Sequence, residues 1–261
     1  MPTIERLSPT DARQAQAWDD FVLACPQATF FHRAAWQRIM RDEFRHDTYY
    51  LYAHESGRIT GVLPLAHVKS MLFGSSLTSL PFAVYGGVAA MDEASASALE
   101  AEAERLAVQL GVPHLELRHT VRRHTDWPEQ DLYVTFRKEI LPDEEANMLA
   151  IPRKQRAMVR KGIKNNLKAD IDSGVDRFFA MYADNVHRHG TPALSKRYFK
   201  SLAREFGDDC QVLTVSSAEG KPLSTVLSFY FRDEVLPYYA GDDFAARDLA
   251  ANDFKCWELM R

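Results

Sequence analysis

Two adjacent tyrosines and two acids lie in the segment LPYYAGDD (236–243), and in a cleft such side chains can donate or orient protons. A tyrosine hydroxyl can donate a proton in a cleft, and an aspartate can orient an amine. Tyr238, Tyr239 and Asp242 are therefore candidate catalytic residues, with proton handling assigned to Tyr239 and Asp242. The alternative is a strand that buries one tyrosine in the core and leaves the other at its edge.

A second candidate is the stretch PRKQRAMVRKGIKNNLK (152–168), which holds seven Lys or Arg and no acid. At about 100° per residue of a helix, these basic side chains fall within an arc of about 160°. Val159 and Ile163 lie outside the arc and are expected to face the core, and Gly162 would bend the stripe if it interrupts the helix. The basic residues are Arg153, Lys154, Arg156, Arg160, Lys161, Lys164 and Lys168.

This basic stripe stands out because the whole chain has a formal net charge of −4. Positive charge concentrated on one helix face favours a polyanion such as RNA, or the diphosphate of a cofactor. A solvated helix face that keeps the protein in solution is the alternative.

A pair of glycines follows Tyr85 in the segment SLPFAVYGGVAA. Gly86 and Gly87 can let the backbone approach a ligand closely, or they can form a bulge in a strand. Both interpretations remain open from the sequence alone.

Several catalytic motifs are absent from the sequence, which narrows the function classes. It contains no GxSxG, HExxH, GxxxxGK[ST] or GxGxxG, so nucleophile-elbow hydrolysis, zinc proteolysis, P-loop phosphoryl transfer and Rossmann chemistry lose support. The three cysteines lie far apart and suggest neither a disulfide framework nor a CxxC metal site. His114, His119 and His124 recur every five residues, a spacing that fits neither a strand face nor a helix face, and we treat them as structural. No metal is expected.

The length and composition are those of an ordinary globular protein. The chain has 261 residues, of which 46% are hydrophobic and 26% charged, enough for two small domains. No apolar run approaches the roughly 18 residues that span a bilayer, and the N-terminus lacks the apolar core of a secretory signal. We expect a cytoplasmic protein, and a peripheral position at the inner membrane is compatible with this.

The elements that position these residues form an internal repeat. Two helical patterns and a hairpin occur twice, about 163 residues apart, and each hairpin turns at a glycine that accepts positive φ cheaply. The first copy comprises helices at 10–24 and 33–44 and a turn at Ser56-Gly57; the second comprises helices at 175–189 and 195–206 and a turn at Glu219-Gly220.

The two copies differ on the C-terminal side of the hairpin. The first continues to a helix at 93–110 and two strand-like runs at 114–120 and 132–140. The second continues to a helix beginning near Ala245, with no counterpart of those two runs. We therefore expect domains at 1–145 and 146–261, the second beginning with the basic helix 152–168 and lacking about the last third of its fold.

Longer segments of the chain resemble the FemAB-related proteins, in particular those found with exosortase/PEP-CTERM and exopolysaccharide gene clusters. The resemblance covers essentially the whole chain and rests on TFFHRAAWQRIM, SLPFAVYGGVAA, IPRKQRAMVRKGIKNN, GTPALSKRYFKSLAREFGDDC, SFYFRDEVLPYYAGDD and ANDFKCWELMR. It implies two tandem acyltransferase domains of the GNAT (Gcn5-related N-acetyltransferase) type. The expected fold is mixed α/β (α+β), with helices packed on a mostly antiparallel sheet in each domain.

The resemblance implies acyl transfer to an amine without a covalent enzyme intermediate. Fem ligases take an aminoacyl group from aminoacyl-tRNA to a peptidoglycan precursor, and wider relatives use acyl-CoA. Neither copy contains the [QR]xxGx[GA] turn with which acyl-CoA-dependent members bind pyrophosphate, and the chain has no room for a coiled-coil arm. No permanently bound cofactor is expected, and the donor is aminoacyl-tRNA or acyl-CoA.

Two hypotheses result. In the first, the chain is an N-acyltransferase acting on a lipid-linked or nucleotide-linked envelope precursor, peptidoglycan or exopolysaccharide. The acceptor would sit in a groove between the domains, and the basic helix would hold phosphates. In the second, a non-catalytic module binds an anionic glycan precursor or RNA. The candidate substrate-binding residues are Trp36, Tyr85, Gly86, Gly87, Arg153, Lys154, Arg156, Arg160 and Lys161.

Overall fold

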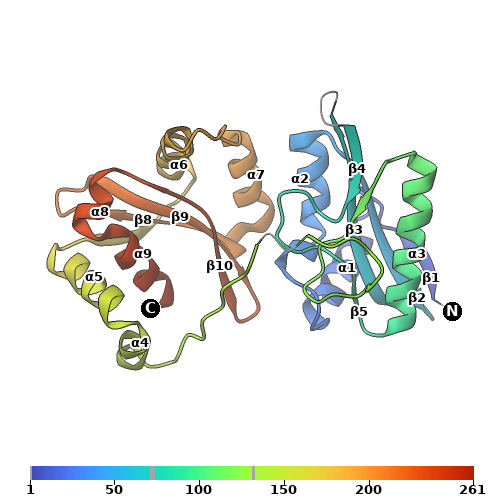
Figure 1. Ribbon diagram of the computed structural model, residues 1–261, viewed down its shortest axis with the longest axis horizontal. Coiled ribbons are helices and arrows are strands. Elements are labelled where there is room, and N and C mark those ends of the chain that lie inside the picture. Colours follow the sequence, from blue (N-terminus) through green and yellow to red (C-terminus); the bar gives the residue numbers. More distant parts are fainter. Residues whose placement is uncertain (1, 71–73, 131–132) are drawn as a thin grey trace. The chain divides into compact units, whose positions relative to one another are not determined.

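The computed structural model describes residues 2–70, 74–130 and 133–261, and it divides into two compact units, Met1–Trp127 and Pro128–Arg261. Each unit has its own sheet with helices packed on both faces (Figure 1). This confirms the expected mixed α/β class with two mostly antiparallel sheets. The boundary that we predicted between residues 145 and 146 was placed from the internal repeat, whereas the two units are defined by their contacts. It stays a prediction.

The first unit follows the order strand, two helices, hairpin, strand, helix, strand. Asp11 and Asp92 start its two longest helices because their carboxylates accept backbone N–H groups of the first turn. Its elements are β1 (Thr3–Arg6), α1 (Ala12–Ala24), the 3-10 turn η1 (Phe30–His32), α2 (Ala35–Phe44), β2 (Asp47–Glu55), β3 (Arg58–Ser70), β4 (Gly74–Thr78), β5 (Ala89–Ala90), α3 (Glu93–Leu110) and β6 (Leu115–Glu116).

The strands of the first unit pair in the order β1-β2-β3-β4-β6, with β5 paired to β3. All pairs are antiparallel except β4 with β6. Helix α3 covers one face and buries leucines such as Leu63 and Leu99, whereas α1 and α2 cover the other (Figure 1). There Trp18 lies against Tyr50, with ring centroids 5.4 Å apart. Both faces of this sheet are therefore buried.

The second unit begins with two helices and then repeats this order up to the helical segment after the hairpin and the next strand; no counterpart of β6 follows among the described residues. Ser195 caps its fourth helix by accepting the Tyr198 N–H. Its elements are α4 (Glu144–Ala150), α5 (Arg153–Lys164), β7 (Lys168–Ile171), α6 (Asp176–Arg188), α7 (Lys196–Phe206), the 3-10 turn η2 (Gly207–Asp209), β8 (Cys210–Ser216), β9 (Pro222–Phe231), β10 (Glu234–Asp242), α8 (Ala245–Leu249) and α9 (Ala251–Met260).

The second sheet is antiparallel throughout, in the order β10-β9-β8-β7. Helix α6 packs on β9 and β10, and α7 packs on β8. Helix α9 lies on the opposite face and carries α5 on its outer side (Figure 1). Phe254 of α9 fills the core there, beside Leu213 and Leu223.

The predicted repeat is confirmed in its elements. Both hairpins turn through residues with positive φ, 78° at Gly57 and 86° at Gly220. Ser56 also has a positive φ of 48°, so the first hairpin has the backbone of the mirror-image turns that match strand twist. The predicted helices at 10–24, 33–44, 93–110, 175–189 and 195–206 correspond to α1, α2, α3, α6 and α7.

The two strand predictions after α3 are largely wrong. In place of a strand over 114–120 the structure has only β6, because the next backbone groups bond elsewhere: Arg118 donates its N–H to Ser79 Oγ at 2.7 Å. Of the predicted strand 132–140, residue 132 lies outside the described residues, and 133–140 has no regular structure and is exposed. A strand-prone sequence makes no strand without a partner edge.

The predicted helix beginning near Ala245 is broken in two. Ala250 adopts the left-handed conformation, with a φ of 61°, and ends α8 before α9 begins. The break turns the chain so that Ala246 and Ala251 both enter the core of the second unit.

Candidate functional site

The candidate site lies on β10, an edge strand of the second sheet. Pro237 pairs with Ser228 and Tyr239 with Leu227, so Tyr238 is an extra residue that forms a β-bulge. Within the described residues, β10 has β9 as its only strand partner. A bulge interrupts the regular ladder and re-aims side chains, and bulges are common beside active sites. The sequence-predicted tyrosines therefore stand at an irregular point of an edge strand.

Tyr239 forms a hydroxyl pair with Tyr198 of α7, with the two oxygens 3.0 Å apart. The Tyr239 ring packs edge-on against Phe199 and Tyr182, whose centroids lie 5.2 and 6.1 Å away. Burial raises the pKa of both paired tyrosines, so both hydroxyls hold their protons at neutral pH. Tyr198 is fully buried, but Tyr239 is only partly so, which leaves Tyr239 as the member that can meet a substrate.

Tyr238 has different surroundings. Its ring lies 5.5 Å from that of Phe229 and stands edge-on to that of Tyr239, with centroids 4.9 Å apart. Phe229 is fully buried, so Tyr238 covers the edge of a core ring. The structure thus places both tyrosines at the bulge, and the hydroxyl pair distinguishes Tyr239.

Asp242 ends β10 as the centre of a polar network. Its Oδ1 accepts from the side-chain amide of Asn185 and from Arg188, and its Oδ2 accepts from Asn252 at 2.9 Å. Arg188 also donates to the Asp242 carbonyl. Both carboxylate oxygens are occupied, so Asp242 fixes the end of β10 between α6 and α9. Its predicted part in proton handling stays a prediction.

The network continues to a buried lysine that the sequence analysis missed. Asn252 accepts the Ser224 hydroxyl at 2.6 Å and Lys255 Nζ at 3.4 Å. Lys255 also donates to the Thr225 carbonyl at 3.3 Å and is 7% exposed. Burial lowers the pKa of Lys255. The signal in the sequence was Asn252 and Lys255 three residues apart, on one face of a helix.

Two glycines set the close packing around this site. A Cβ on Gly241 of β10 would lie 2.6 Å from Tyr182 N and 2.7 Å from Met181 O, so only glycine lets α6 sit this near the strand. Gly162 does the same between α5 and α9, where a Cβ would lie 2.7 Å from Phe254 Cβ. Gly162 lies inside α5 and does not interrupt it.

The basic stripe divides into two groups. Arg153, Lys154, Arg160, Lys161 and Lys164 are exposed on α5, and no carboxylate among the described residues pairs with them. Arg156 instead donates to the carbonyls of Leu149 and Ile151 at 2.9 to 3.2 Å and holds the connection from α4 to α5.

Three expectations about the stripe need correction. Lys168 belongs to β7 rather than to the helix. Val159 is buried as predicted, but Ile163 is 48% exposed although it was expected to face the core. The helix predicted over 152–168 covers only Arg153–Lys164, with Pro152 as its N-cap.

The candidate residues of the first unit have structural partners. Trp36 is fully buried, and its Nε1 donates to the Phe30 carbonyl at 3.3 Å, so it lies in the core and not on a binding surface. The backbone N–H groups of Gly86 and Gly87 both donate to the Arg118 carbonyl, at 3.1 and 2.9 Å. A Cβ on Gly87 would overlap His119 Nδ1. The close approach that these glycines allow is therefore to the chain itself.

Tyr85, which precedes these glycines, is partly buried. The Gly87 carbonyl bonds to His32 Nε2 at 2.8 Å, and the Thr29 N–H donates to His32 Nδ1. Because Nδ1 accepts, Nε2 carries the proton, and this places a neutral imidazole in the core of the first unit.

Glu100 of α3 lies beside His119 and His124, two of the three histidines that we treated as structural. Its buried carboxylate pairs with Arg123 at 2.7 Å and lies 3.4 and 3.3 Å from the Nε2 atoms of His119 and His124. Arg123 also pairs with the exposed Glu93. The cluster ties the segment after β6 to α3, which agrees with a structural role for these histidines.

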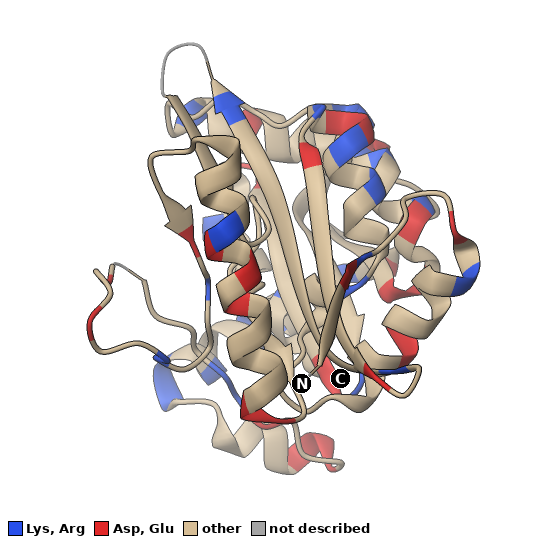
Figure 2. Cartoon of the chain, turned by 90° about the vertical axis from the view of Figure 1, so that its right-hand side faces the viewer, with Lys and Arg blue, Asp and Glu red and all other residues tan. Residues whose placement is uncertain are grey.

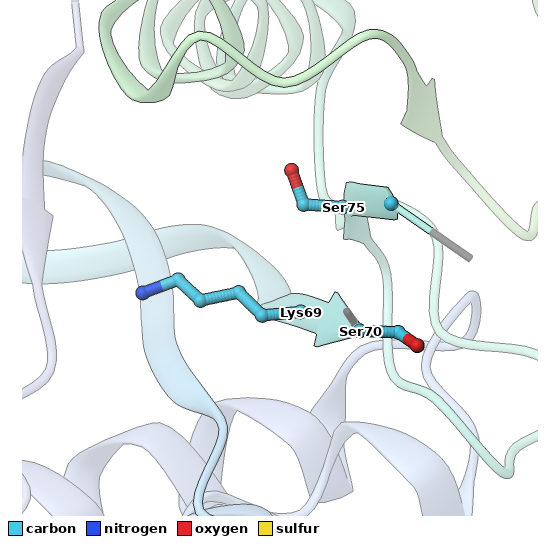
Figure 3. Close-up of a pocket in the computed structure, with 4 residues that line it drawn as sticks. Lys69, Ser70 and Ser75 are labelled. Atoms are coloured by element: carbon cyan, nitrogen blue, oxygen red, sulfur yellow. The ribbon is translucent and has the colours of Figure 1, made fainter. Parts of the chain in front are cut away.

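A shallow hollow between β3 and β4 offers little chemistry. It is lined by Lys69, Ser70, Gly74 and Ser75, and the three labelled side chains point in different directions (Figure 3). Lys69 is paired with Asp47 at 2.7 Å. Across residues 2–70, 74–130 and 133–261, no three His, Cys, Asp or Glu side chains are grouped so that they could hold a metal ion. No helix in that same part of the chain is long and apolar enough to cross a membrane.

Comparison with known proteins places the candidate site in a recognised domain. Residues 153–261 match the family model described as Acetyltransferase (GNAT) domain. A search of curated proteins found no match to the chain.

Solved structures extend the likeness to both units. The crystal structure of FemX has a TM-score of 0.74 at 12% identity and covers 99% of this chain and 85% of its own. A tandem GNAT protein from the clavulanic acid biosynthesis pathway has a TM-score of 0.51 at 13% identity, with coverages of 99% and 84%. L-PGS from Bacillus licheniformis has a TM-score of 0.52 at 12% identity, with coverages of 96% and 74%.

These identities establish the fold and no more. Residues 153–261 match the GNAT domain model, and the chain as a whole is similar in fold to FemX and to a tandem GNAT protein. This agrees with the repeat seen in the sequence. It also puts Tyr238, Tyr239 and Asp242 inside the matched domain.

Proposed function

We propose that the protein is an N-acyltransferase whose second unit carries out the reaction beside β10. The observation that carries the proposal is the bulge at Tyr238, next to the hydroxyl pair of Tyr239 and Tyr198, in the unit that matches the GNAT domain. A bulge leaves a strand residue out of the regular ladder. The acyl oxygen becomes negatively charged during the reaction and needs hydrogen-bond donors close to it.

The reaction joins an amine to an activated acyl group. The amine nitrogen attacks the carbonyl carbon of a thioester or ester, an N–C bond forms, and the carbonyl oxygen takes up negative charge. The C–S or C–O bond then breaks, the leaving sulfur or oxygen accepts a proton, and the new amide nitrogen gives up its extra proton. In this step the Tyr239 hydroxyl donates its proton to the leaving group and takes up the proton that the nitrogen gives up, while the Tyr198 hydroxyl 3.0 Å away orients the Tyr239 hydroxyl.

Asp242 supports this step by holding the end of the strand. Its network joins α6 and α9 to β10. We propose that it positions the backbone next to Tyr239 and leaves proton transfer to the tyrosine pair.

The finer assignment rests on the sequence resemblance and on FemX as the structural neighbour. The donor is aminoacyl-tRNA or acyl-CoA, and the acceptor is the amine of a cell-envelope precursor, peptidoglycan or exopolysaccharide, met in the cytoplasm. The link to exosortase/PEP-CTERM gene clusters belongs to the same proposal. The sequence lacks the [QR]xxGx[GA] turn with which acyl-CoA-dependent relatives bind pyrophosphate, so it does not favour acyl-CoA over aminoacyl-tRNA. Both donors are therefore tested.

The test measures transfer from labelled acetyl-CoA and from labelled aminoacyl-tRNA to a panel of amines and envelope precursors. Tyr239→Phe removes one hydroxyl and is expected to lower kcat by about 100-fold to 1,000-fold with KM little changed. Tyr230→Phe removes a hydroxyl from a partly buried tyrosine of the neighbouring strand and is the matched control. Equal activity of both variants would contradict the role of Tyr239. No transfer from either donor by the unmodified protein would favour the non-catalytic module.

A further inference from the structure

The basic face of α5 is a surface that the proposed reaction does not use. Arg153, Lys154, Arg160, Lys161 and Lys164 are all exposed, and no carboxylate among the described residues neutralises them. At about 100° per residue they fall within roughly 120° of the helix circumference, directly opposite the buried side at Val159 and Gly162. Five like charges therefore face outward along one helix of 12 residues.

This arrangement works against the stability of the helix. Arg153 and Lys154 begin α5, where the helix dipole repels cations, and the first turn has no acid to offset them. Several cations on other helices are paired with acids, for example Arg105 with Glu102 and Arg188 with Asp184. Figure 2 shows basic and acidic residues interspersed over the elements that face the viewer. These cations disfavour the helix, and no acid among the described residues offsets them, which points to an anionic partner outside the fold.

The helix is held rigidly with this face outward. Gly162 lets Phe254 of α9 pack so close that a Cβ at position 162 would lie only 2.7 Å from Phe254 Cβ. Val159, on the same side of α5, is 3% exposed. At the other end the Arg156 guanidinium bonds to two carbonyls of the preceding segment. The backbone that carries the five cations is therefore already in place, and the helix does not have to fold when a partner arrives.

Aliphatic side chains flank the cations. Ile163 is 48% exposed at the C-terminal end of α5, and Leu149 is 57% exposed at the end of α4. Arg156 ties Leu149 to α5, because its guanidinium donates to the Leu149 carbonyl at 2.9 Å. Exposed aliphatic groups beside a row of Lys and Arg match the interface of an anionic bilayer, where phosphates and acyl chains lie close together.

We propose that the basic face of α5, together with Leu149 and Ile163, docks the protein on the surface of an anionic lipid bilayer. RNA would use the cations equally well but would gain nothing from the two aliphatic side chains, and α5 contains no aromatic residue on which a base could stack. The lipid surface is therefore the partner that uses all of these residues. The proposal concerns docking and holds whether or not β10 is catalytic.

Vesicle cosedimentation tests the proposal. The purified protein is mixed with vesicles of phosphatidylcholine alone or with about one third phosphatidylglycerol, at low and at high salt. We expect binding only to the anionic vesicles, released by salt as the Debye length shrinks. Each basic residue near such a surface contributes about a fivefold gain in affinity, so Arg153→Glu/Arg160→Glu is expected to lower binding by at least about 25-fold.

The matched control is Arg13→Glu/Arg58→Glu, which makes the same change in net charge at two exposed arginines of the first unit. It is expected to bind anionic vesicles like the unmodified protein. A loss equal to that of the α5 variant would overturn the proposal, because net charge alone would then explain the binding.

A second variant separates lipid from RNA. Leu149→Ser/Ile163→Ser keeps every charge and is expected to weaken vesicle binding several-fold while leaving binding to bulk tRNA unchanged. If the protein binds tRNA through α5 and ignores anionic vesicles, the stripe is an RNA surface and the proposal is wrong. Circular dichroism and thermal unfolding show separately whether the α5 variants are folded.

Discussion

The corresponding strands β4 and β10 differ in what occupies their outer edges. In the first unit, β6 pairs parallel with β4, and the Ser79 N–H donates to the Glu116 carbonyl, so the chain itself occupies the edge. In the second unit, β10 has a bulge at Tyr238, and no strand within the described residues pairs along its outer edge. The same order of elements thus gives a closed edge in one unit and an irregular one in the other.

The buried polar groups of the two units also differ in what they hold together. Glu100 draws Arg123, His119 and His124 together and ties one segment of the first unit to another. In the second unit, Asp242 and Lys255 belong to the network that holds the end of β10. Tyr239 on the same strand has a raised pKa, so its hydroxyl stays protonated, and its side chain is partly exposed. These contacts agree with the proposal that the second unit carries the reaction, while the buried polar groups of the first unit hold its own segments together.

The largest expected effect on stability comes from the first unit. Glu100→Gln removes the buried carboxylate and leaves the Arg123 guanidinium without its main partner, which is expected to cost about 3–5 kcal/mol of unfolding free energy. Urea unfolding measures the loss. Turnover of the folded fraction is expected to stay within about twofold, and a kcat effect as large as that of Tyr239→Phe would contradict the division between the units.

Gly241→Ala tests how tightly β10 is held. The new Cβ would meet the backbone of Met181 and Tyr182 at 2.6 to 2.7 Å, so α6 or the strand must move. We expect a loss of about 3 kcal/mol in unfolding free energy and a fall in kcat. Gly61→Ala in the first unit is the comparison, because its nearest atom is a side-chain methyl of Leu99 at 2.9 Å, which can shift. A larger loss for Gly61→Ala would contradict this prediction.

Gly162→Ala is expected to have a smaller effect. Its Cβ would lie 2.7 Å from Phe254 Cβ, which pushes α5 away from α9 at a cost of about 1–3 kcal/mol. Part of this is offset because alanine favours the helix by about 1 kcal/mol over glycine. Thermal unfolding measures the net change, and a stabilised variant would show that α5 does not pack on α9 as described.

The smallest effect is a change in pH dependence. Burial lowers the pKa of Lys255, so the folded state binds its proton less readily than the unfolded chain does. The contribution of Lys255 to stability therefore increases as the pH rises towards its ordinary value and falls as the pH is lowered. We compare the unfolding free energies of the unmodified protein and of Lys255→Met. From pH 7 to pH 10, the unmodified protein is expected to gain stability relative to the variant. A difference that does not change with pH would contradict a lowered pKa.

Periodicity predicted the helices and the two hairpins because each depends on local spacing and on one turn. It failed for 133–140, where strand-prone residues have no partner, since pairing is not local. The tyrosines of the site were identified from their position after a strand, but the bulge and the contact with Tyr198 were not. Both depend on register and packing across 41 residues of sequence. Asn252 and Lys255 were missed because only burial distinguishes them from surface residues.

Hydrogen–deuterium exchange with and without donor tests most directly whether β10 is where the donor binds. Acetyl-CoA and aminoacyl-tRNA are added in separate experiments, and peptides covering Glu234–Asp242 are compared with peptides covering Gly74–Thr78. The account predicts slower exchange in β10 with the donor that supports transfer and no change in β4. Protection of β4 alone, or transfer without any protection of β10, would contradict it.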